Sequence, residues 1–419
     1  MKLVLVAGAV AALVAGTTAL RGEAEQVVIL SGDTQGYLSP CGCSSPMIGG
    51  IRRKAALVRK LSISGNTTYL ENGGLVEARG RQDAIKAETL AESFEAMGVT
   101  AINVGPRDAG LGIGAILQLS QFAPGKLITL SIANPEAHYL GTTVPSGPFL
   151  VGGATEAPQA VAGSLGDSAV PLGRSVKDLV DAAETAGLKP VLMLQGSHDT
   201  AARLAHDFPD LALIEYSAFG SPPLAIETVG STVLATPGES GKFVVALTYR
   251  DGRFGGYRSI ALGPELKDDP EVSRYYAAYL RRVKEEKLID ALPRKATAAY
   301  AGSWACGSCH ASATHIWKGS DHRFAFQTLR KQMHDADPDC VSCHVVGLDS
   351  TKGFRSQAST PQLAGVGCES CHGPALNHVK SPSRVKLPRI TQKACLGCHN
   401  PLNSPNFEFN SYWRKIAHR

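Results

Sequence analysis

Four short cysteine motifs near the end of the chain are the residues most able to do chemistry. In each, two cysteines are separated by two residues and followed at once by a histidine. The motifs span Cys306–His310, Cys340–His344, Cys368–His372 and Cys395–His399. This spacing is the attachment signature of c-type haem, in which two thioether bonds hold the porphyrin and the histidine binds iron. The sequence therefore predicts four covalently attached haems.

Every cysteine of these motifs is a predicted attachment point: Cys306, Cys309, Cys340, Cys343, Cys368, Cys371, Cys395 and Cys398. The predicted proximal iron ligands are His310, His344, His372 and His399. Zinc ribbons and disulfide-type redox sites also use cysteine pairs, and they remain the alternatives. Neither of them requires a histidine directly after the second cysteine, four times in succession.

A low-spin haem that carries electrons needs a second axial ligand, either histidine or methionine. The C-terminal region holds one methionine, Met333, but five further histidines: His315, His322, His334, His378 and His418. This surplus favours bis-histidine ligation. His378 follows His372 by six residues, too short a stretch to wrap round the haem attached there, so we expect it to serve a different haem.

The charge is divided unevenly along the chain. Residues 300–419 contain 14 Lys and Arg against 7 Asp and Glu, a net charge of +7, whereas the whole chain carries +5. Each haem adds two propionates, so four haems would bring about −8 and nearly neutralise this region. We therefore interpret the basic residues as compensation for haem, and expect no nucleic-acid partner, since no basic run is interleaved with aromatic residues.

Residues 1–24 are predicted to be an export signal or a membrane anchor. Lys2 provides a positive start, and Leu3 to Leu20 is an apolar run of Ala, Val, Leu and Gly. The run borders on the length that spans a bilayer, so an uncleaved anchor remains the alternative. Both interpretations predict a periplasmic or extracytoplasmic protein, and the anchor interpretation associates it with a membrane through this segment.

Strand-like and helix-like segments alternate from Glu25 to about Leu262, which predicts a layered α/β domain over residues 25–262. Two late strand-like runs, Val229–Ala235 and Lys242–Tyr249, are expected to form an antiparallel hairpin around Pro237 and Gly238. A charged helix with Asp269 as N-cap and Pro270 at its first position is expected in a connector over residues 263–298. The haem domain is expected over residues 299–419.

The α/β segment resembles the metallophosphoesterase domain of the 5′-nucleotidase family. The matching stretches are S-G-D-T-Q-G-Y-L (31–38), G-G-I-R-R-K-A-A-L-V (49–58), L-E-N-G-G (70–74), A-M-G-V-T-A-I-N-V-G-P-R-D (96–108) and L-S-I-A-N (130–134). The resemblance implies a four-layer α/β sandwich that holds two metal ions at its strand ends.

The metal ligands of that family are nevertheless missing from this sequence. The first motif keeps Asp33 but has Gln35 in place of histidine, and Gly74 stands where the bridging aspartate belongs. The Gly-Asn-His-Glu motif reads Gly-Pro-Arg-Asp at 105–108, and the later histidine-bearing strand ends in Gln195. A two-metal hydrolytic site needs several such ligands. We therefore expect an inactive scaffold.

Cys41 and Cys43 lie in the loop after the first strand, where the parent fold places its catalytic face. All other cysteines are assigned to haem, so this pair has only itself. Gly42 would allow the tight backbone that a ring between the two cysteines requires. A static disulfide and a redox-active dithiol are both open for this pair, and so is a soft-metal site.

The C-terminal region resembles the tetrahaem cytochrome c-554 family. It carries Y-A-G-S-W-A-C-G-S-C-H (300–310), W-K-G-S-D-H (317–322), D-C-V-S-C-H-V-V-G (339–347), G-V-G-C-E-S-C-H-G-P (365–374) and A-C-L-G-C-H (394–399). The resemblance implies His378 as distal ligand of the first haem, His322 of the third and His418 of the fourth. It also implies that the first and third haems stack.

The second haem, on His344, is five-coordinate in the best-known member of that family. Either His315 or His334 could close the iron here; otherwise it stays open to a small molecule such as nitric oxide. The sequence thus predicts an exported electron carrier that passes electrons to redox partner proteins. The alternative is an oxidoreductase that acts at the open second haem or through Cys41 and Cys43.

Overall fold

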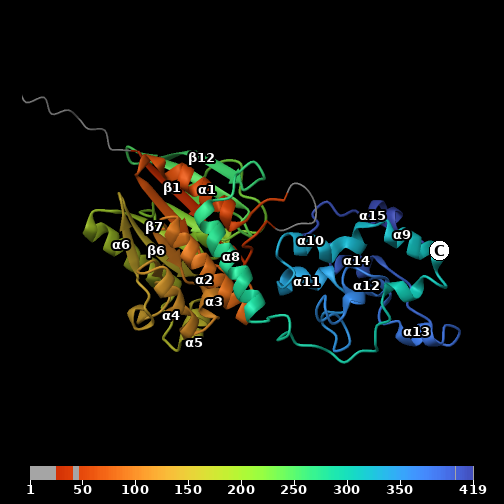
Figure 1. Cartoon of the computed structure of the whole chain (residues 1–419). Coiled ribbons are helices and arrows are strands. Elements are labelled where there is room, and N and C mark those ends of the chain that lie inside the picture. The colour runs from red at the N-terminus through yellow and green to blue at the C-terminus, as the bar shows by residue number, and fades with distance from the viewer. Residues whose placement is uncertain (1–24, 41–46, 402, 419) are drawn as a thin grey trace, which may run out of the picture.

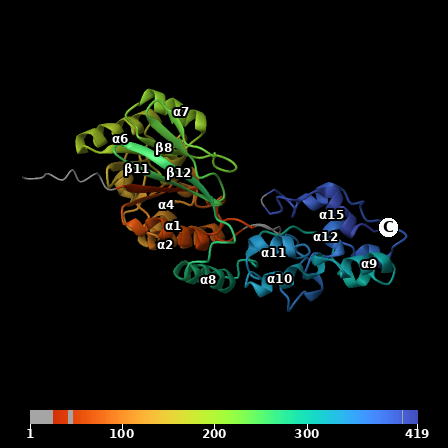
Figure 2. The same cartoon turned by 90° about the horizontal axis from the view of Figure 1, so that it is seen from above.

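The computed structural model describes residues 25–40, 47–401 and 403–418. The chain forms an α/β domain followed by a helical domain, and the two lie side by side (Figures 1 and 2). Residues 1–24 and the Cys41–Cys43 pair lie outside the described residues, so both predictions about them remain predictions. No helix among the described residues reaches the length and apolar character needed to span a bilayer.

The α/β domain contains two six-stranded sheets. The first runs in the order β12-β11-β1-β2-β3-β4 and the second in the order β5-β6-β7-β8-β10-β9. The strands of the first sheet are β1 (Gln26–Ser31), β2 (Thr67–Glu71), β3 (Ala101–Asn103), β4 (Leu127–Ile128), β11 (Phe243–Arg250) and β12 (Arg253–Ala261). Those of the second are β5 (Thr143–Ser146), β6 (Phe149–Thr155), β7 (Lys189–Gln195), β8 (Leu213–Tyr216), β9 (Glu227–Val229) and β10 (Thr232–Ala235). Strands β1 to β4 are parallel, as the βα alternation predicts.

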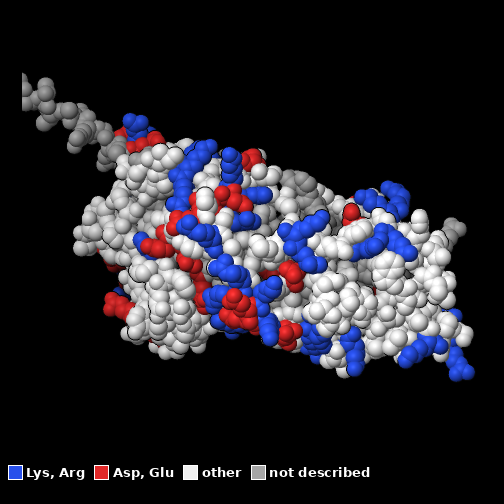
Figure 3. Space-filling model, viewed as in Figure 1, with Lys and Arg blue, Asp and Glu red and all other residues white. Residues whose placement is uncertain are grey.

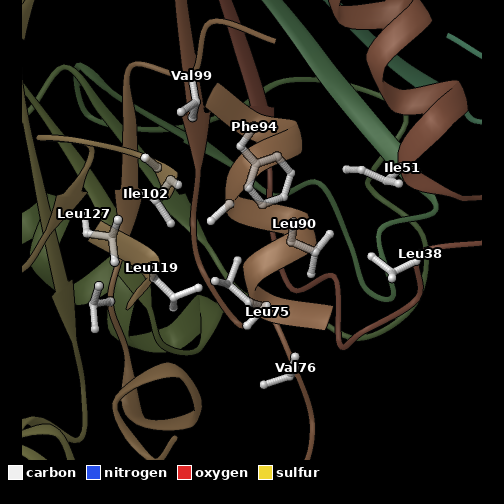
Figure 4. Packing of buried hydrophobic residues seen from close by; sticks show 14 of the residues in the cluster. Leu38, Ile51, Leu75, Val76, Leu90, Phe94, Val99, Ile102, Leu119 and Leu127 are labelled. Atoms are coloured by element: carbon white, nitrogen blue, oxygen red, sulfur yellow. The ribbon is translucent and has the colours of Figure 1, made fainter. Parts of the chain in front are cut away.

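Helices cover the outer face of each sheet. They are α1 (Ile51–Leu61), α2 (Arg81–Ala96), α3 (Pro106–Ala109), α4 (Ile113–Phe122), α5 (Pro158–Leu165), α6 (Leu172–Ala186) and α7 (His198–Asp207). One apolar cluster joins the first sheet to its helices, including Phe94 and Leu90 of α2 and Ile51 of α1 (Figure 4). A second cluster lies between the sheets, and a third lies under α6 and α7. The expected four-layer α/β sandwich is confirmed.

The expected hairpin around Pro237 and Gly238 is wrong. Strand β10 pairs with β8 and β9, whereas β11 pairs with β1 and β12, so the turn connects the two sheets. Gly238 adopts φ 75°, and a Cβ there would lie 2.4 Å from the carbonyl oxygen of Gly220. Two strand-like runs around a Pro-Gly turn look like a hairpin locally. In the structure, β10 and β11 instead pair within different sheets, where their apolar side chains are buried.

Helix α8 (Pro270–Glu285) closes the first sheet's helical layer. Its first turn is capped by Asp269, whose carboxylate accepts hydrogen bonds from the backbone N–H groups of Glu271 and Val272 at 3.0 Å each, as predicted. The buried side chains of α8 join the core cluster that also contains α1 and α2. Helix α8 is therefore packed into the α/β domain, and it also faces the helical domain (Figure 1).

The helical domain consists of short helices with little apolar core. They are α9 (Ala311–Lys318), α10 (Ala325–Lys331), α11 (Pro338–His344), α12 (Cys368–His372), α13 (Leu376–Lys380), α14 (Gln392–Leu396) and α15 (Phe409–Ile416). The second and third motifs end α11 and make up α12. The domain's buried apolar residues form one small cluster around Phe326, Val341 and Phe354. Such a domain needs a further source of cohesion.

A cluster of charged residues is buried inside the α/β domain. The Lys54 ammonium lies 3.3 Å from the Glu71 carboxylate, which also accepts a hydrogen bond from Ser31. Glu215 on β8 is fully buried, and neither of its carboxylate oxygens has a hydrogen-bond partner among the described residues. Burial therefore raises the pKa of Glu215 well above its ordinary value.

Glu215→Gln is expected to stabilise the domain in a pH-dependent way. A raised folded pKa means that Glu215 lowers stability as the pH rises from about 4.5 through the folded pKa. Glutamine does not ionise, whereas Glu215 is largely protonated near pH 4. The variant and the wild type should therefore have similar unfolding temperatures at that pH. At pH 8 it should unfold about 2–4 °C higher, which corresponds to roughly 1 kcal/mol in a domain of this size.

Thermal unfolding followed by circular dichroism across this pH range measures the effect. The exposed Glu184 on α6 provides the control, and Glu184→Gln should behave like the wild type at every pH. A pH-independent effect of Glu215→Gln would contradict the proposed cause.

Candidate haem-binding site

Three pairs of histidine rings face one another across the helical domain. The ring centres of His310 and His378 are 6.2 Å apart, with an interplanar angle of 28°. Those of His322 and His399 are also 6.2 Å apart, at 48°. The third pair, His372 and His418, is separated by 6.0 Å at 50°. Each pair joins the histidine of a cysteine motif to a histidine from outside the motifs.

This separation fits an iron held between two imidazoles. A metal–histidine nitrogen bond is about 2 Å long, and a nitrogen lies roughly 1 Å from its ring centre. These two lengths add up to about 3 Å on each side of an iron, which places the two ring centres about 6 Å apart. Aromatic pairs in general have ring centres about 4.5–7 Å apart, so what singles out these three pairs is that each contains one motif histidine. The three pairs thus fit bis-histidine haem.

Hydrogen bonds to the Nδ1 atoms orient several of these rings. The Nδ1 atoms of His344, His378 and His418 lie 2.6, 2.7 and 2.9 Å from the carbonyl oxygens of Ala325, Val385 and Ile416. A carbonyl only accepts, so Nδ1 must carry the proton and Nε2 must offer its lone pair. This second contact is what fixes the tautomer of metal-binding histidines.

Burial keeps several of these imidazoles neutral. It lowers the pKa of His322, His372 and His399 from the ordinary value, because the charged form loses its hydration. Only a neutral imidazole has a lone pair to give to a metal. The same burial that shields the rings from water therefore keeps them ready to bind iron.

Two of the three expected pairings are exchanged in the structure. His378 lies opposite His310, as expected for the first haem. His322, however, lies opposite His399 of the fourth motif, and His418 lies opposite His372 of the third. The resemblance had implied the reverse assignment for His322 and His418. Sequence order does not reveal such pairings, because the segments come together only through the tertiary fold.

The attachment cysteines also meet in pairs. The Cys306 thiol of the first motif hydrogen-bonds to Cys368 of the third, which raises the pKa of Cys306. Cys343 of the second motif contacts Cys398 of the fourth in the same way, and this contact lowers the pKa of Cys343 to about 6. The first and third attachment sites are therefore neighbours, as are the second and fourth.

The second motif is different, because no histidine ring faces His344 among the described residues. His315 is exposed on α9. His334 lies near this motif, with its Nδ1 3.5 Å from the Cys340 sulfur, but its Nε2 lies 2.9 Å from the Tyr276 hydroxyl of α8. Neither of the two candidates is thus placed as a partner of His344.

A hydrogen-bond network lies at the strand ends where the resemblance implies a metal site. The Asp108 carboxylate accepts hydrogen bonds from Gly74 N, Leu75 N and Gly105 N at 2.8–3.1 Å. The Gln195 amide adds a fourth at 3.1 Å. Gln195, which stands at the end of the strand where the family carries a histidine, therefore donates a hydrogen bond to Asp108.

Arg107 lies at the same face and forms an ion pair with Asp33. Its guanidinium lies 2.9 Å from Asp33, the one family ligand that remains, and supplies the positive charge there. A Cβ at Gly74 would lie 2.8 Å from the Asp33 carboxylate, so the space of the bridging aspartate is closed. Within the described ranges, no group of three or more His, Cys, Asp and Glu side chains could hold a metal ion.

Comparison with known proteins assigns the C-terminal region a relative. The family model "Cytochrome c554 and c-prime" matches residues 305–373, which contain the first three motifs. Cytochrome c-554 of Nitrosomonas europaea is 38% identical over 138 residues, covering 25% of this chain and 59% of that protein. The C-terminal region resembles cytochrome c-554. The match spans about three fifths of that relative's length.

Solved structures similar to this chain share the fold of its α/β domain. The sulfate thiohydrolase SoxB of Thermus thermophilus aligns with TM-score 0.52 and 16% identity over 63% of this chain and 61% of its own. A 5′-nucleotidase precursor from the same organism (TM-score 0.54, 16%) and the NAD nucleotidase of Haemophilus influenzae (0.54, 12%) each cover 74% of this chain and 68% of their own. These identities establish the metallophosphoesterase-like fold alone.

The pairing of the distal histidines can be tested by removing one haem. In a Cys395→Ser/Cys398→Ser background, which cannot attach a haem at the fourth motif, His322→Ala should leave the spin state unchanged. His418→Ala should instead convert one further iron per chain to high spin, because His418 faces His372. Electron paramagnetic resonance of the ferric protein measures this. High-spin iron in the His322→Ala variant and none in the His418→Ala variant would instead support His322 as the distal ligand of the third haem.

The α/β domain is expected to take up no catalytic metal, because Arg107 and Gln195 occupy the metal-binding face. Adding Mn²⁺ to the purified protein should leave its unfolding temperature unchanged, and hydrolysis of a phosphodiester should not exceed the rate without protein. Elemental analysis provides a second readout. Stoichiometric manganese or zinc in this domain, or metal-dependent turnover, would show that the site is intact.

Proposed function

We propose that the protein is an exported tetrahaem c-type cytochrome that transfers electrons between redox partner proteins. The observation that carries the proposal is the set of three imidazole pairs, each 6.0–6.2 Å apart and each containing one motif histidine. Haem iron, when bound there, cycles between two oxidation states and so accepts and releases single electrons. The similarity to cytochrome c-554 supports the same conclusion.

The chain's own contribution is to hold the ligands rigidly. Nδ1 of each oriented histidine is bound by a carbonyl, so the ring keeps the same position in both oxidation states. The neighbouring attachment cysteines, Cys306 beside Cys368 and Cys343 beside Cys398, support close approach of the attached groups in two pairs. An electron carrier needs such fixed and closely spaced sites rather than a substrate pocket.

The surface charges support this proposal as well. Over the helical domain, the face seen in Figure 3 carries Lys and Arg with few acidic residues, whereas the α/β domain mixes both signs. Haem propionates would balance this excess. We also propose an extracytoplasmic location, because c-type haem is attached outside the cytoplasm and residues 1–24 have the composition of an export signal.

A second candidate function is the reaction of a small molecule, such as nitric oxide, at the haem on His344. It is favoured by one observation, that no imidazole faces His344 among the described residues. An iron with one protein ligand has an open position for a diatomic molecule. Spectroscopy of the ferric and ferrous protein separates the two functions, since a pure carrier would be low-spin at all four irons.

Four haems per chain are expected in the purified protein. The mass of the intact chain should exceed that of the polypeptide by four haems, and four electrons should be taken up on full reduction. Cys368→Ser/Cys371→Ser should remove one haem and one electron. A zinc-loaded protein, or one with free motif thiols after normal expression, would contradict the proposal.

A further inference from the structure

Side chains of the α/β domain hydrogen-bond to the segment that carries the second motif. Asp337 is the N-cap of α11, the helix that ends in His344, and is only 6% exposed. Its carboxylate accepts hydrogen bonds from Gln82 of α2 at 2.7 Å and from the Tyr279 hydroxyl of α8 at 2.9 Å. Both donors belong to the α/β domain. They therefore anchor α11 to the neighbouring domain.

A second contact lies within the first turn of α11, at the same interface. Lys86 of α2 forms an ion pair with Asp339, and the Lys86 side chain is only 10% exposed. Helices α8, α10 and α11 are also adjacent in both views of the molecule (Figures 1 and 2). The first turn of α11 is thus held by two acidic side chains, each bound by the α/β domain.

Tyr276 extends this interface to His334. It is 6% exposed and stacks against Tyr279, with the Arg52 guanidinium 4.7 Å from its ring centre. Its hydroxyl lies 2.9 Å from His334 Nε2 and also hydrogen-bonds to Ser39. The other ring nitrogen of His334 lies 3.5 Å from the sulfur of Cys340 in the second motif.

His334 therefore differs from the histidines that face a motif histidine. His378 and His418 use Nδ1 for a carbonyl, which leaves the Nε2 lone pair for iron. In His334 the Nε2 atom is engaged by Tyr276 instead. If Nε2 accepts from the hydroxyl its lone pair is used, and if it donates it has no lone pair to give. In either tautomer, Nε2 of His334 cannot bind iron while it contacts Tyr276.

We propose that Tyr276 is a positioning residue through which the α/β domain keeps His334 away from the iron held by His344. This inference rests on the proposed function, since it concerns the haem of the second motif. It gives the inactive α/β domain a role, because it supplies Tyr276 and the anchors on Asp337 and Asp339. The iron on His344 stays open to a small ligand as a result of this contact between domains.

Tyr276→Phe in the full-length holoprotein tests the proposal. The variant removes the hydroxyl and keeps the ring packing, so His334 Nε2 becomes available to the iron. The high-spin ferric signal of the wild type should decrease by more than half. The affinity of the ferrous protein for nitric oxide should fall by about 3- to 10-fold, the factor expected from losing one hydrogen bond. Tyr276→Phe/His334→Ala should restore both quantities.

Tyr279→Phe is the matched control, because it removes a hydroxyl from the same interface that contacts Asp337 rather than His334. It should keep the wild-type signal and affinity. An equal effect of Tyr279→Phe would show that loosening the interface is enough, and would overturn the role of Tyr276. An unchanged Tyr276→Phe variant would overturn it too.

His334→Ala in the wild-type background gives an independent measurement that does not require Tyr276→Phe to fold. It should leave the high-spin signal unchanged, since His334 is not a ligand in the wild type. A gain of high-spin iron in this variant, or a wild type without high-spin iron, would overturn the inference. Haem content per chain reports separately on the proposed function, since four low-spin haems would leave that function standing.

Discussion

The helical domain is organised around one recurring spacing between imidazole rings, which is the separation that an iron held between two imidazoles would require. Three pairs of rings from distant parts of the chain stand 6.0–6.2 Å apart. The apolar cluster of this domain is small, and among the described residues it has nine buried members, which include Phe326, Val341 and Phe354. Bonds from the chain to haem would therefore replace much of the cohesion that a hydrophobic core supplies elsewhere. The short helices would hold in place the residues that form these bonds.

The α/β domain combines a metallophosphoesterase-like fold with a hydrogen-bond network at the face where the resemblance predicts metal ligands. Arg107 brings a positive charge to Asp33, and Gln195 donates to Asp108. Among the described residues, the four layers are held together by three apolar clusters, none of which contains Asp33, Arg107, Asp108 or Gln195. Fold and activity are separable for this reason.

The interface between the domains contains polar contacts around a buried carboxylate, that of Asp337. Asp337 accepts hydrogen bonds from two side chains of the α/β domain, and Lys86 pairs with Asp339. Buried acceptors with several donors demand a defined geometry, so this interface fixes the orientation of α11. The motif that α11 carries is also the one without a facing imidazole among the described residues. The α/β domain therefore lies next to the second motif, on α11.

The sequence by itself determined the local features of this protein. The spacing of the four motifs predicted the haem attachment residues, and the Asp269-Pro270 pair located the start of α8. The alternation of strand and helix patterns, together with the family resemblance, predicted the four-layer fold. Each of these depends on residues close together in the chain, where spacing and periodicity carry the information.

Only the tertiary structure decided which distant segments meet. It placed His322 opposite His399 and His418 opposite His372, reversing the expected assignment. It also sent β10 and β11 to different sheets and brought Tyr276 to His334. These contacts join segments separated by tens of residues, and burial and ligand geometry select them among many partners of the same type. Residue type and spacing cannot make that selection.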